Sequence, residues 1–304
     1  MRDRMVAPTA AALTDLSVFT RSDALLVGLS DRDLREGVAN RRIRRLGRGL
    51  YATGERPPTR ADQLLERARA VARLHPGRLA ISHHAALLLH RVAVHEVPLH
   101  LLYAVRLAGG VHSTSALVIA RPKTLTPTVE VDGITVVQPG VAVIQVATTF
   151  GLRAGVVAAD SALHRGMVTV ADLQAEVSRV GQVAGAGVAR LAVSRCAAGA
   201  ESPGESLLRL IAEEVGFEVT TQFPISQGRG VPFAYADLRL NGTNRLLEFD
   251  GAIKYEGVNG RTALMAEKVR EDRIRRLGWA LDRVIWNDFN DIETLKARLR
   301  AYLP

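Results

Sequence analysis

The 304-residue sequence has a single cysteine, Cys196, and lacks any long uninterrupted hydrophobic run. One cysteine can form no intramolecular disulfide and no cysteine-based zinc site, which argues against a secreted disulfide scaffold. The most apolar later stretch, residues 141–159, is interrupted by Gln145 and Arg153. We therefore expect no membrane span, no signal peptide at the N-terminus and no membrane partner, and a reducing, cytoplasmic setting.

Two common signatures of metabolic enzymes are also missing from the sequence. It contains no glycine-rich phosphate loop and no Gly-x-Ser-x-Gly elbow, and its sole cysteine, Cys196, lies in an alanine-rich segment. With 47% hydrophobic and 23% charged residues and a mean hydropathy of +0.07, the composition is that of a globular protein. Its length suggests two or three domains.

The net charge of +9 is distributed unevenly along the chain. Residues 1–60 hold 12 basic and 7 acidic side chains, residues 61–200 hold 13 and 8, and residues 201–304 hold 15 and 16. The net charges of the three segments are therefore +5, +5 and −1. A basic surplus indicates a polyanionic partner rather than a fold, so the first two segments are the expected binding end.

Two short helices and a hairpin are predicted near the N-terminus. Thr20 and Ser30 are each followed by helix-forming residues and are expected N-caps, with Gly28 between the two helices. Residues 41–52 then place apolar positions on both sides of a glycine-centred turn. This order is typical of a winged helix-turn-helix, in which residues 30–39 would enter the major groove of double-stranded DNA.

Arginines are dense in this segment, and they are the expected DNA contacts. Those of the wing would bind phosphates or the minor groove. A solvated basic turn is the alternative, because a charge run alone is often only a wet surface. The candidate DNA-binding residues are Arg32, Arg35, Arg41, Arg42, Arg44, Arg45 and Arg48.

Residues 19–53 resemble the N-terminal winged helix-turn-helix of the AbiEi-type antitoxin family. Residues 83–90 and 156–169 are also similar to segments of that family, so that the resemblance covers most of the first 200 residues. It implies a transcriptional repressor of its own operon that neutralises a nucleotidyltransferase toxin, in a type IV toxin–antitoxin system. A toxin is therefore a possible partner; the oligomeric state is left open.

All eight histidines lie between His75 and His164, and three of them, His83, His84 and His90, share one helical segment. No cysteine or local carboxylate cluster accompanies them. We expect these histidines to pack in the core and assign no metal to them.

The middle of the chain is predicted to mix strands and helices. Strands are expected at residues 99–105, 115–120 and 133–137, and helices at 141–180 and 184–200. Residues 199–204 are the expected boundary to a last domain. The predicted fold class is thus α+β or α/β, with a winged helix-turn-helix (1–60), a mixed α/β, antitoxin-like middle domain (61–200) and a C-terminal domain (201–304).

The last domain carries a predicted hairpin with acidic residues. A helix is expected from Pro203, then a strand at 218–225 and two strands at 233–240 and 245–251 around Asn241-Gly242. A loop of two or four residues pairs positions whose numbers sum to 485, which places Asp237 opposite Glu248 on one face. A three-residue loop would place them on opposite faces.

Asp237, Glu248 and Asp250 would then form a cluster of carboxylates that repel one another unless a cation or proton intervenes. Mg²⁺ (or Mn²⁺) prefers such hard oxygen ligands, so these three acids are the candidate metal ligands. The ion could lower the pKa of an attacking water and stabilise charge on a scissile phosphate. Lys254 could add a positive charge near that phosphate.

The ordered series of residues resembles the PD-(D/E)XK nuclease superfamily, specifically its branch similar to very-short-patch-repair endonucleases. Glu205 matches the helical acid, Asp237 the first metal-binding acid and Glu248 the second, and residues 267–286 are similar to the following helix and strand. The resemblance implies a restriction-endonuclease-like fold and a Mg²⁺-dependent endodeoxyribonuclease with catalytic residues Glu205, Asp237, Glu248, Asp250 and Lys254.

The sequence departs from that superfamily at Asp250, where lysine is common. Lys254 is a candidate replacement. Two functions are therefore open: a DNA-targeted endonuclease, or an AbiEi-like repressor and antitoxin whose last domain keeps a nuclease fold without catalysis.

Overall fold

The computed structural model describes residues 17–109, 111–114, 116–120, 126–228, 230–251 and 260–303, the segment 260–264 by its backbone alone. These residues form eleven α-helices and three β-sheets, a mixed α+β content. Two compact units are distinguished: one holds the chain up to Val92 together with Val97–Val146, and the other holds Ala93–Glu96 and Ala147–Pro304. The three-domain organisation, with boundaries after residues 60 and 200, stays a prediction.

The N-terminal part is a small sheet with two helices. Both expected N-caps are confirmed, since Thr20 and Ser30 each form a capping box with an aspartate three residues later. Phe19, Ala24 and Leu34 form its core, with Ile43 and Tyr51 packed against them. The elements are β1 (Val18–Thr20), α1 (Arg21–Leu26), α2 (Asp31–Ala39), β2 (Ile43–Gly47) and β3 (Leu50–Thr53), and the antiparallel strand order is β1-β3-β2.

The predicted hairpin is present as β2 and β3, joined through Gly49, whose φ of 72° suits glycine. β2 is an edge strand of this sheet.

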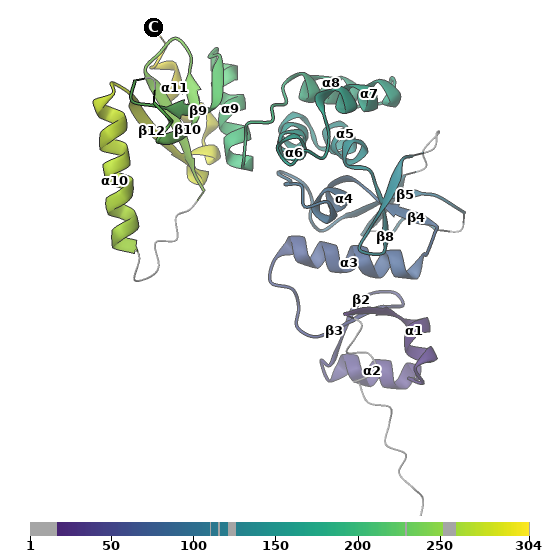
Figure 1. Cartoon of the computed structure of the whole chain (residues 1–304). Helices are drawn as coiled ribbons and strands as arrows, with labels where there is room; N and C mark the ends of the chain where they lie inside the picture. Colours follow the sequence, from purple (N-terminus) through teal and green to yellow (C-terminus); the bar gives the residue numbers. More distant parts are fainter. Residues whose placement is uncertain are drawn as a thin grey trace, which may run out of the picture. The chain divides into compact units, whose positions relative to one another are not determined.

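The middle of the chain forms a five-stranded sheet of order β6-β5-β4-β8-β7, in which β4 is parallel to β8, β5 is parallel to β6 and the other pairs are antiparallel. The three strands predicted from the sequence are confirmed as β5, β6 and β8. The elements are α3 (Arg60–Leu74), β4 (Leu79–Ile81), α4 (His83–Leu89), β5 (Leu102–Arg106), β6 (Leu117–Ala120), β7 (Thr128–Val131) and β8 (Ile134–Val137). Figure 1 shows α3 running beside this sheet, and its residues contact β4 and β8 as well as β1 and β3.

Four helices follow this sheet, where helix was predicted over residues 141–180 and 184–200. The predicted run is broken at Gly151, whose φ of 100° ends one helix and begins the next. The helices are α5 (Pro139–Phe150), α6 (Leu152–His164), α7 (Val170–Val180) and α8 (Ala186–Ser194). Among all helices of the described residues, none combines the length and apolarity needed to cross a membrane.

Residues 201–303 form a four-stranded sheet with helices on both faces. Its order is β12-β11-β10-β9, with β12 parallel to β11 and the other pairs antiparallel. The elements are α9 (Pro203–Val215), β9 (Val219–Ile225), β10 (Ala234–Leu240), β11 (Arg245–Asp250), α10 (Gly260–Arg276), β12 (Ala280–Ile285), the 3₁₀ helix η2 (Trp286–Asn290) and α11 (Ile292–Arg300).

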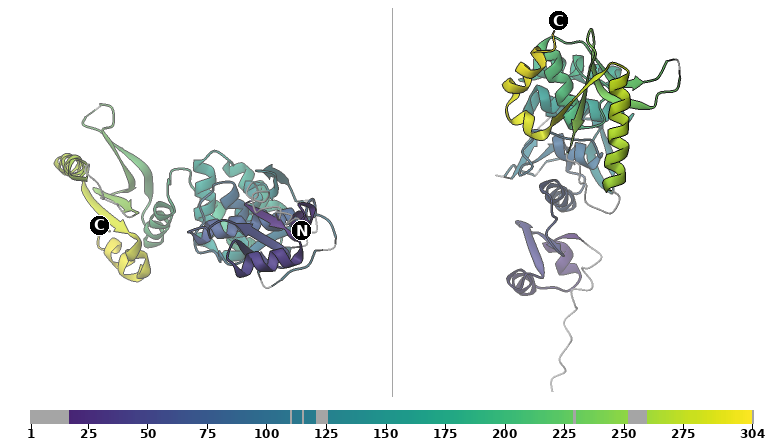
Figure 2. Two further views of the ribbon diagram at one scale, coloured as in Figure 1. Left: turned by 90° about the horizontal axis from the view of Figure 1, so that it is seen from below. Right: turned by 90° about the vertical axis from the view of Figure 1, so that its left-hand side faces the viewer.

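The predicted hairpin register is confirmed, because Leu238 pairs with Leu247 and Leu240 with Arg245 across a four-residue loop. Side chains alternate between two cores. Leu238 and Leu247 pack with α9 and α11, whereas Leu246 packs with Ile274 of α10. Figure 2 shows α9 and α10 on opposite sides of the strands.

Candidate functional site

Glu205 lies in the first turn of α9, where the local sequence fixes its position. Ser202 caps the helix and Pro203 occupies its first turn. A Cβ on Gly204 would lie 2.1 Å from the ring of Phe249, so only glycine lets this turn approach β11 so closely. The Glu205 carboxylate is buried and accepts hydrogen bonds from the Glu201 amide at 2.9 Å and the Gln222 side chain at 3.3 Å.

Asp237 lies on β10 at the point where the pairing with β9 is irregular. Neighbouring positions pair on both sides of it, but Gln222, which would face it, has a left-handed φ of 48°. The Asp237 carboxylate accepts a hydrogen bond from the Phe249 amide at 2.7 Å. The pKa of Asp237 is raised to about 7, chiefly by burial and also by the nearby charges of Glu205 and Glu248, against the lowering effect of the hydrogen bond from the Phe249 amide.

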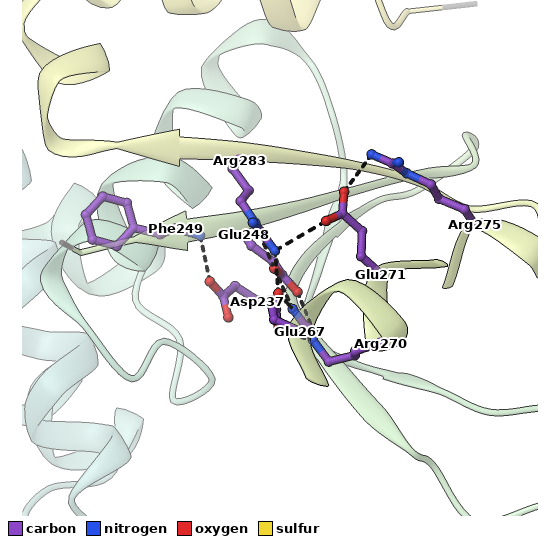
Figure 3. Close-up of polar contacts among 8 residues, drawn as sticks. All are labelled: Asp237, Glu248, Phe249, Glu267, Arg270, Glu271, Arg275 and Arg283. Atoms are coloured by element: carbon purple, nitrogen blue, oxygen red, sulfur yellow. Dashed lines mark hydrogen bonds and ion pairs between the residues drawn. The ribbon is translucent and has the colours of Figure 1, made fainter. Parts of the chain in front are cut away.

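Glu248 lies on β11 and is bonded to arginines. Arg270 of α10 donates to both of its carboxylate oxygens at 2.9 Å, and the Nε of Arg283 on β12 lies 3.7 Å away. Both arginines also bond Glu267, and Arg283 approaches Glu271 at 3.7 Å. Figure 3 shows these five side chains gathered between α10 and the strands. We call them the ion-pair cluster.

The charges of the ion-pair cluster stabilise one another. The hydrogen bonds that Arg270 donates to Glu267 and Glu248 raise the pKa of Arg270, and the hydrogen bond from Arg270 lowers the pKa of Glu267. The Glu248 side chain is only 13% exposed, so its charge depends on these partners. The cluster therefore holds α10 against the sheet.

Asp250 is half-buried at the end of β11, where it pairs with Ile285 of β12. Its carboxylate makes no hydrogen bond or ion pair with another described residue. Lys254, the proposed replacement for the missing lysine, lies within residues 252–259, outside the described residues.

The described residues contain no group of three or more His, Cys, Asp or Glu side chains placed to hold one metal ion. The donor chemistry of Glu205 and Asp237 does suit a divalent cation, because Glu205 is a buried and Asp237 a half-buried carboxylate, and neither has a cationic partner among the described residues. Glu248 suits it less in this arrangement, since Arg270 already bonds both of its oxygens. The assignment of Mg²⁺ to Asp237, Glu248 and Asp250 stays a prediction.

The seven candidate DNA-binding arginines lie on α2, on β2 or beside them, but they differ in their contacts. Arg44 turns toward α3, where Glu66 holds it by hydrogen bonds of 2.5 and 2.9 Å. Arg32 pairs with Glu36 at 2.8 Å, and Arg35 donates to a carbonyl of its own helix at 3.2 Å. Arg21 and, to a smaller extent, Arg35 lower the pKa of the nearby Asp31 carboxyl. The exposed ones without a carboxylate partner among the described residues are Arg41, Arg42, Arg45 and Arg48.

The buried histidines of α4 make contacts that support a structural role. Burial lowers the pKa of His83 to about 3 and that of His84 to about 4, so both are neutral at physiological pH. His84 Nε2 lies 3.0 Å from the Leu101 carbonyl, and His90 Nε2 lies 2.9 Å from that of Val137.

Sequence reasoning missed the arginine partners of Glu248 and the arginines of α3. The spacing of Glu267 and Arg270, three residues apart on a helix, was a signal for one ion pair. Nothing local could indicate that Arg270 reaches β11. In comparisons with known proteins, no family model and no curated protein matches this chain.

Proposed function

We propose that this protein binds double-stranded DNA through a winged helix-turn-helix formed by α2 and the β2–β3 hairpin, and that residues 201–304 are a PD-(D/E)XK-like endonuclease domain that hydrolyses DNA phosphodiesters with Mg²⁺ or Mn²⁺. The observation that carries the nuclease proposal is the proximity of Glu205 and Asp237, a buried acid of α9 and a half-buried acid of β10, with the pKa of Asp237 raised to about 7. Carboxylates placed in this way need a proton or a cation.

The DNA-binding part rests on exposed, unpaired arginines. Arg41, Arg42, Arg45 and Arg48 are exposed around the β2–β3 hairpin, and α2 lies beside it. Guanidinium groups that lack a carboxylate partner attract phosphates and release counterions when these bind. A helix beside a basic hairpin can place side chains in a groove while the hairpin holds the backbone.

In the nuclease domain, Glu205 and Asp237 would hold the cation, whose chemistry is to lower the pKa of a water and stabilise charge on the phosphate. The Phe249 amide keeps one oxygen of Asp237 oriented. Asp237 retains its proton below pH about 7, so the apparent affinity for Mg²⁺ should rise as the pH increases toward that value. Calorimetric titration with Mg²⁺ at several pH values measures this directly.

Plasmid cleavage tests the activity. The purified full-length protein is incubated with supercoiled plasmid and Mg²⁺ or Mn²⁺, beside the Asp237→Asn and Glu205→Gln variants. Glu293→Gln, which removes a carboxylate that is 75% exposed on α11, is the matched control. We expect nicking by the wild type and the control but not by the two site variants. No nicking with either metal, or equal nicking by Asp237→Asn, refutes the activity.

The second candidate is an AbiEi-like transcriptional repressor and antitoxin with a non-catalytic C-terminal domain. The bidentate bonding of Glu248 by Arg270 favours it, because that acid is then structural rather than a ligand. Gel shifts with the upstream region of the chain's own gene test it, with Arg45→Ala and Arg48→Ala variants. Specific binding without cleavage under any metal, together with a neighbouring toxin gene, would favour this candidate.

A further inference from the structure

A hollow lined mainly by arginines lies between the β2–β3 hairpin and α3. It encloses about 380 Å³, and its charged and polar lining residues are Arg44, Arg45, Arg56, Gln63, Glu66 and Arg67. Four guanidinium groups thus face one carboxylate. Glu66 is already bonded by Arg44, and Arg56 donates to Gln63 at 2.7 Å. The hollow therefore has a surplus of positive charge.

Arg67 is the member of this group whose charge is least compensated. Burial lowers the pKa of Arg67, and no carboxylate among the described residues pairs with it. Its Nε is buried without a hydrogen-bond partner in the same part of the chain. Its one contact there is at the limit of hydrogen bonding, 3.5 Å from the terminal nitrogen to the Leu99 carbonyl. A half-buried guanidinium in this state is costly unless an anion binds it.

This hollow adjoins a second one on the outer side of β2. The second hollow is lined by Arg41 and Arg42 near the end of α2 and by one acid, Glu55, and it shares Arg44, Arg45 and Arg56 with the first. Because β2 is an edge strand, no further strand of the described residues covers this side. We call the six arginines of the two hollows the basic edge.

The basic edge is long enough for several phosphates. A strand of five residues such as β2 spans about 17 Å, and one strand of DNA advances about 3.4 Å along the axis per nucleotide. Because that strand winds around the axis, its backbone path per nucleotide is longer than this axial advance, so the edge can contact roughly two or three successive phosphates. Such a row of guanidinium groups suits a polymer of phosphates better than a single small anion.

We propose that one strand of the DNA backbone follows the basic edge from the end of α2 to α3, and that a phosphate of this backbone binds in the hollow beside Arg67 and Arg56. The proposal rests on the proposed DNA binding and extends it beyond the hairpin to α3. Arg67 and Arg56 are then phosphate-positioning residues, which carry no base specificity but fix how the protein lies on the duplex.

The test measures the binding of a short fluorescein-labelled DNA duplex by the full-length protein as a function of salt. Arg67→Gln and Arg56→Gln are compared with Arg60→Gln, a matched control, because Arg60 is exposed on the same helix and does not line the hollow. Each lost phosphate contact should make the slope of log K against log salt about 0.9 less steep. The factor by which the DNA affinity falls between about 50 and 200 mM salt is then about 3.5-fold smaller in the variant than in the wild type.

We expect this change for Arg67→Gln and Arg56→Gln but not for Arg60→Gln. If Arg67→Gln fails to fold, as checked by circular dichroism, Arg56→Gln carries the test, because Arg56 is exposed. If the wild type binds DNA but the salt slope is unchanged in both Arg67→Gln and Arg56→Gln, the proposed phosphate site in the hollow is refuted, while the proposed DNA binding is not. Absence of wild-type DNA binding instead overturns the proposed function.

A second measurement distinguishes the DNA backbone from a free phosphate compound. Inorganic pyrophosphate is added to the wild type and to Arg67→Gln, and the melting temperature is recorded. One outcome overturns the backbone proposal in favour of a small phosphorylated ligand. In that outcome, pyrophosphate raises the melting temperature of the wild type but not of Arg67→Gln, while the two proteins bind DNA with the same affinity. Competition between pyrophosphate and DNA, lost in Arg67→Gln, supports the backbone proposal.

Discussion

The arginines of the N-terminal part and those of the C-terminal part differ in what lies beside them. Arg41, Arg42, Arg45 and Arg48 surround the β2–β3 hairpin, are exposed and have no carboxylate partner among the described residues. In the C-terminal part, by contrast, Arg209, Arg270 and Arg283 each contact at least two acids.

This difference separates two uses of one residue type. A paired, buried arginine makes folding depend on its partner, because removal leaves a charge without compensation. An unpaired, exposed arginine contributes little to stability and is available for a polyanion. The comparison therefore predicts that arginine substitutions in the two parts affect different measurements, stability in one and DNA affinity in the other.

The largest effect is expected at the buried pair between α6 and α9. Arg209 and Asp160, with side chains 4% and 0% exposed, bond at 2.8 Å, and Asp160 also accepts from the Ala197 amide. We expect Arg209→Met to lower the free energy of unfolding by about 3–5 kcal/mol, because Asp160 is left buried and unpaired. Urea unfolding measures this.

Arg300→Met, at an exposed position on α11, is the control and should change the free energy of unfolding by less than about 0.5 kcal/mol. The double variant Asp160→Leu with Arg209→Met should recover much of the loss, because both charges are then gone. If the double variant loses as much free energy of unfolding as Arg209→Met alone, the loss comes from altered packing rather than from the unpaired charge.

Asp237, like Glu205, is an exception in the C-terminal part, because it is an acid without a cationic partner among the described residues, and it is half-buried. Its pKa in the folded state, about 7, lies above the ordinary 3.8, so the folded state keeps a proton that the unfolded state loses between these values. Stability should therefore fall as the pH rises from about 4 to about 7. Asp237→Asn should remove this dependence and stabilise the protein at about pH 8 by on the order of 3 kcal/mol.

Unfolding at pH values on both sides of 7 checks this prediction. The variant and the wild type should have similar stability near pH 3, below the ordinary pKa of 3.8, where the carboxyl is mostly protonated in both the folded and the unfolded state. A variant that is less stable than the wild type at pH 8 would mean that the ionised form has a cationic partner, against the arrangement described above.

An intermediate effect is expected in the ion-pair cluster. Arg270→Met removes both bonds to Glu248 and leaves Arg283, whose Nε lies 3.7 Å from that carboxylate. We expect a loss of about 2 kcal/mol in the free energy of unfolding, less than for Arg209 because Arg270 is partly exposed. High salt should reduce the difference from the wild type. An equal loss at all salt concentrations would indicate lost packing of the arginine stem rather than lost charge.

Local patterns in the sequence were sufficient to predict much of the fold. The caps at Thr20 and Ser30, the strands around Asn241-Gly242 and the register of Leu238 with Leu247 were predicted correctly, because each depends on neighbouring residues. The mixed α+β content followed from these patterns.

The contacts of the charged side chains could not be predicted in the same way. Arg44 bonds Glu66, 22 residues away, and Arg270 bonds Glu248, also 22 residues away. Such pairs depend on how helices pack on sheets, which no local period encodes. The pKa of Asp237 likewise depends on burial and on Glu205, a residue of another element.

The smallest effect on stability, and the sharpest test of the comparison, is expected for the exposed arginines of the hairpin. A triple variant, Arg42→Gln, Arg45→Gln and Arg48→Gln, removes three charges that have no carboxylate partner in the described chain. Its free energy of unfolding should stay within about 0.5 kcal/mol of the wild type. Its DNA affinity should fall, with a salt slope about 2.7 less steep if each arginine binds one phosphate.

Gel shifts or fluorescence anisotropy at several salt concentrations measure the slope, and urea unfolding measures stability on the same preparations. Removing positive charges that repel one another can even stabilise the hairpin slightly, so a small gain also agrees with the comparison. A large loss of stability with an unchanged salt slope would reverse the assignment, since these arginines would then serve the fold as Arg270 does. Loss of affinity at constant stability would place DNA binding in the N-terminal part, whether or not the C-terminal acids cleave DNA.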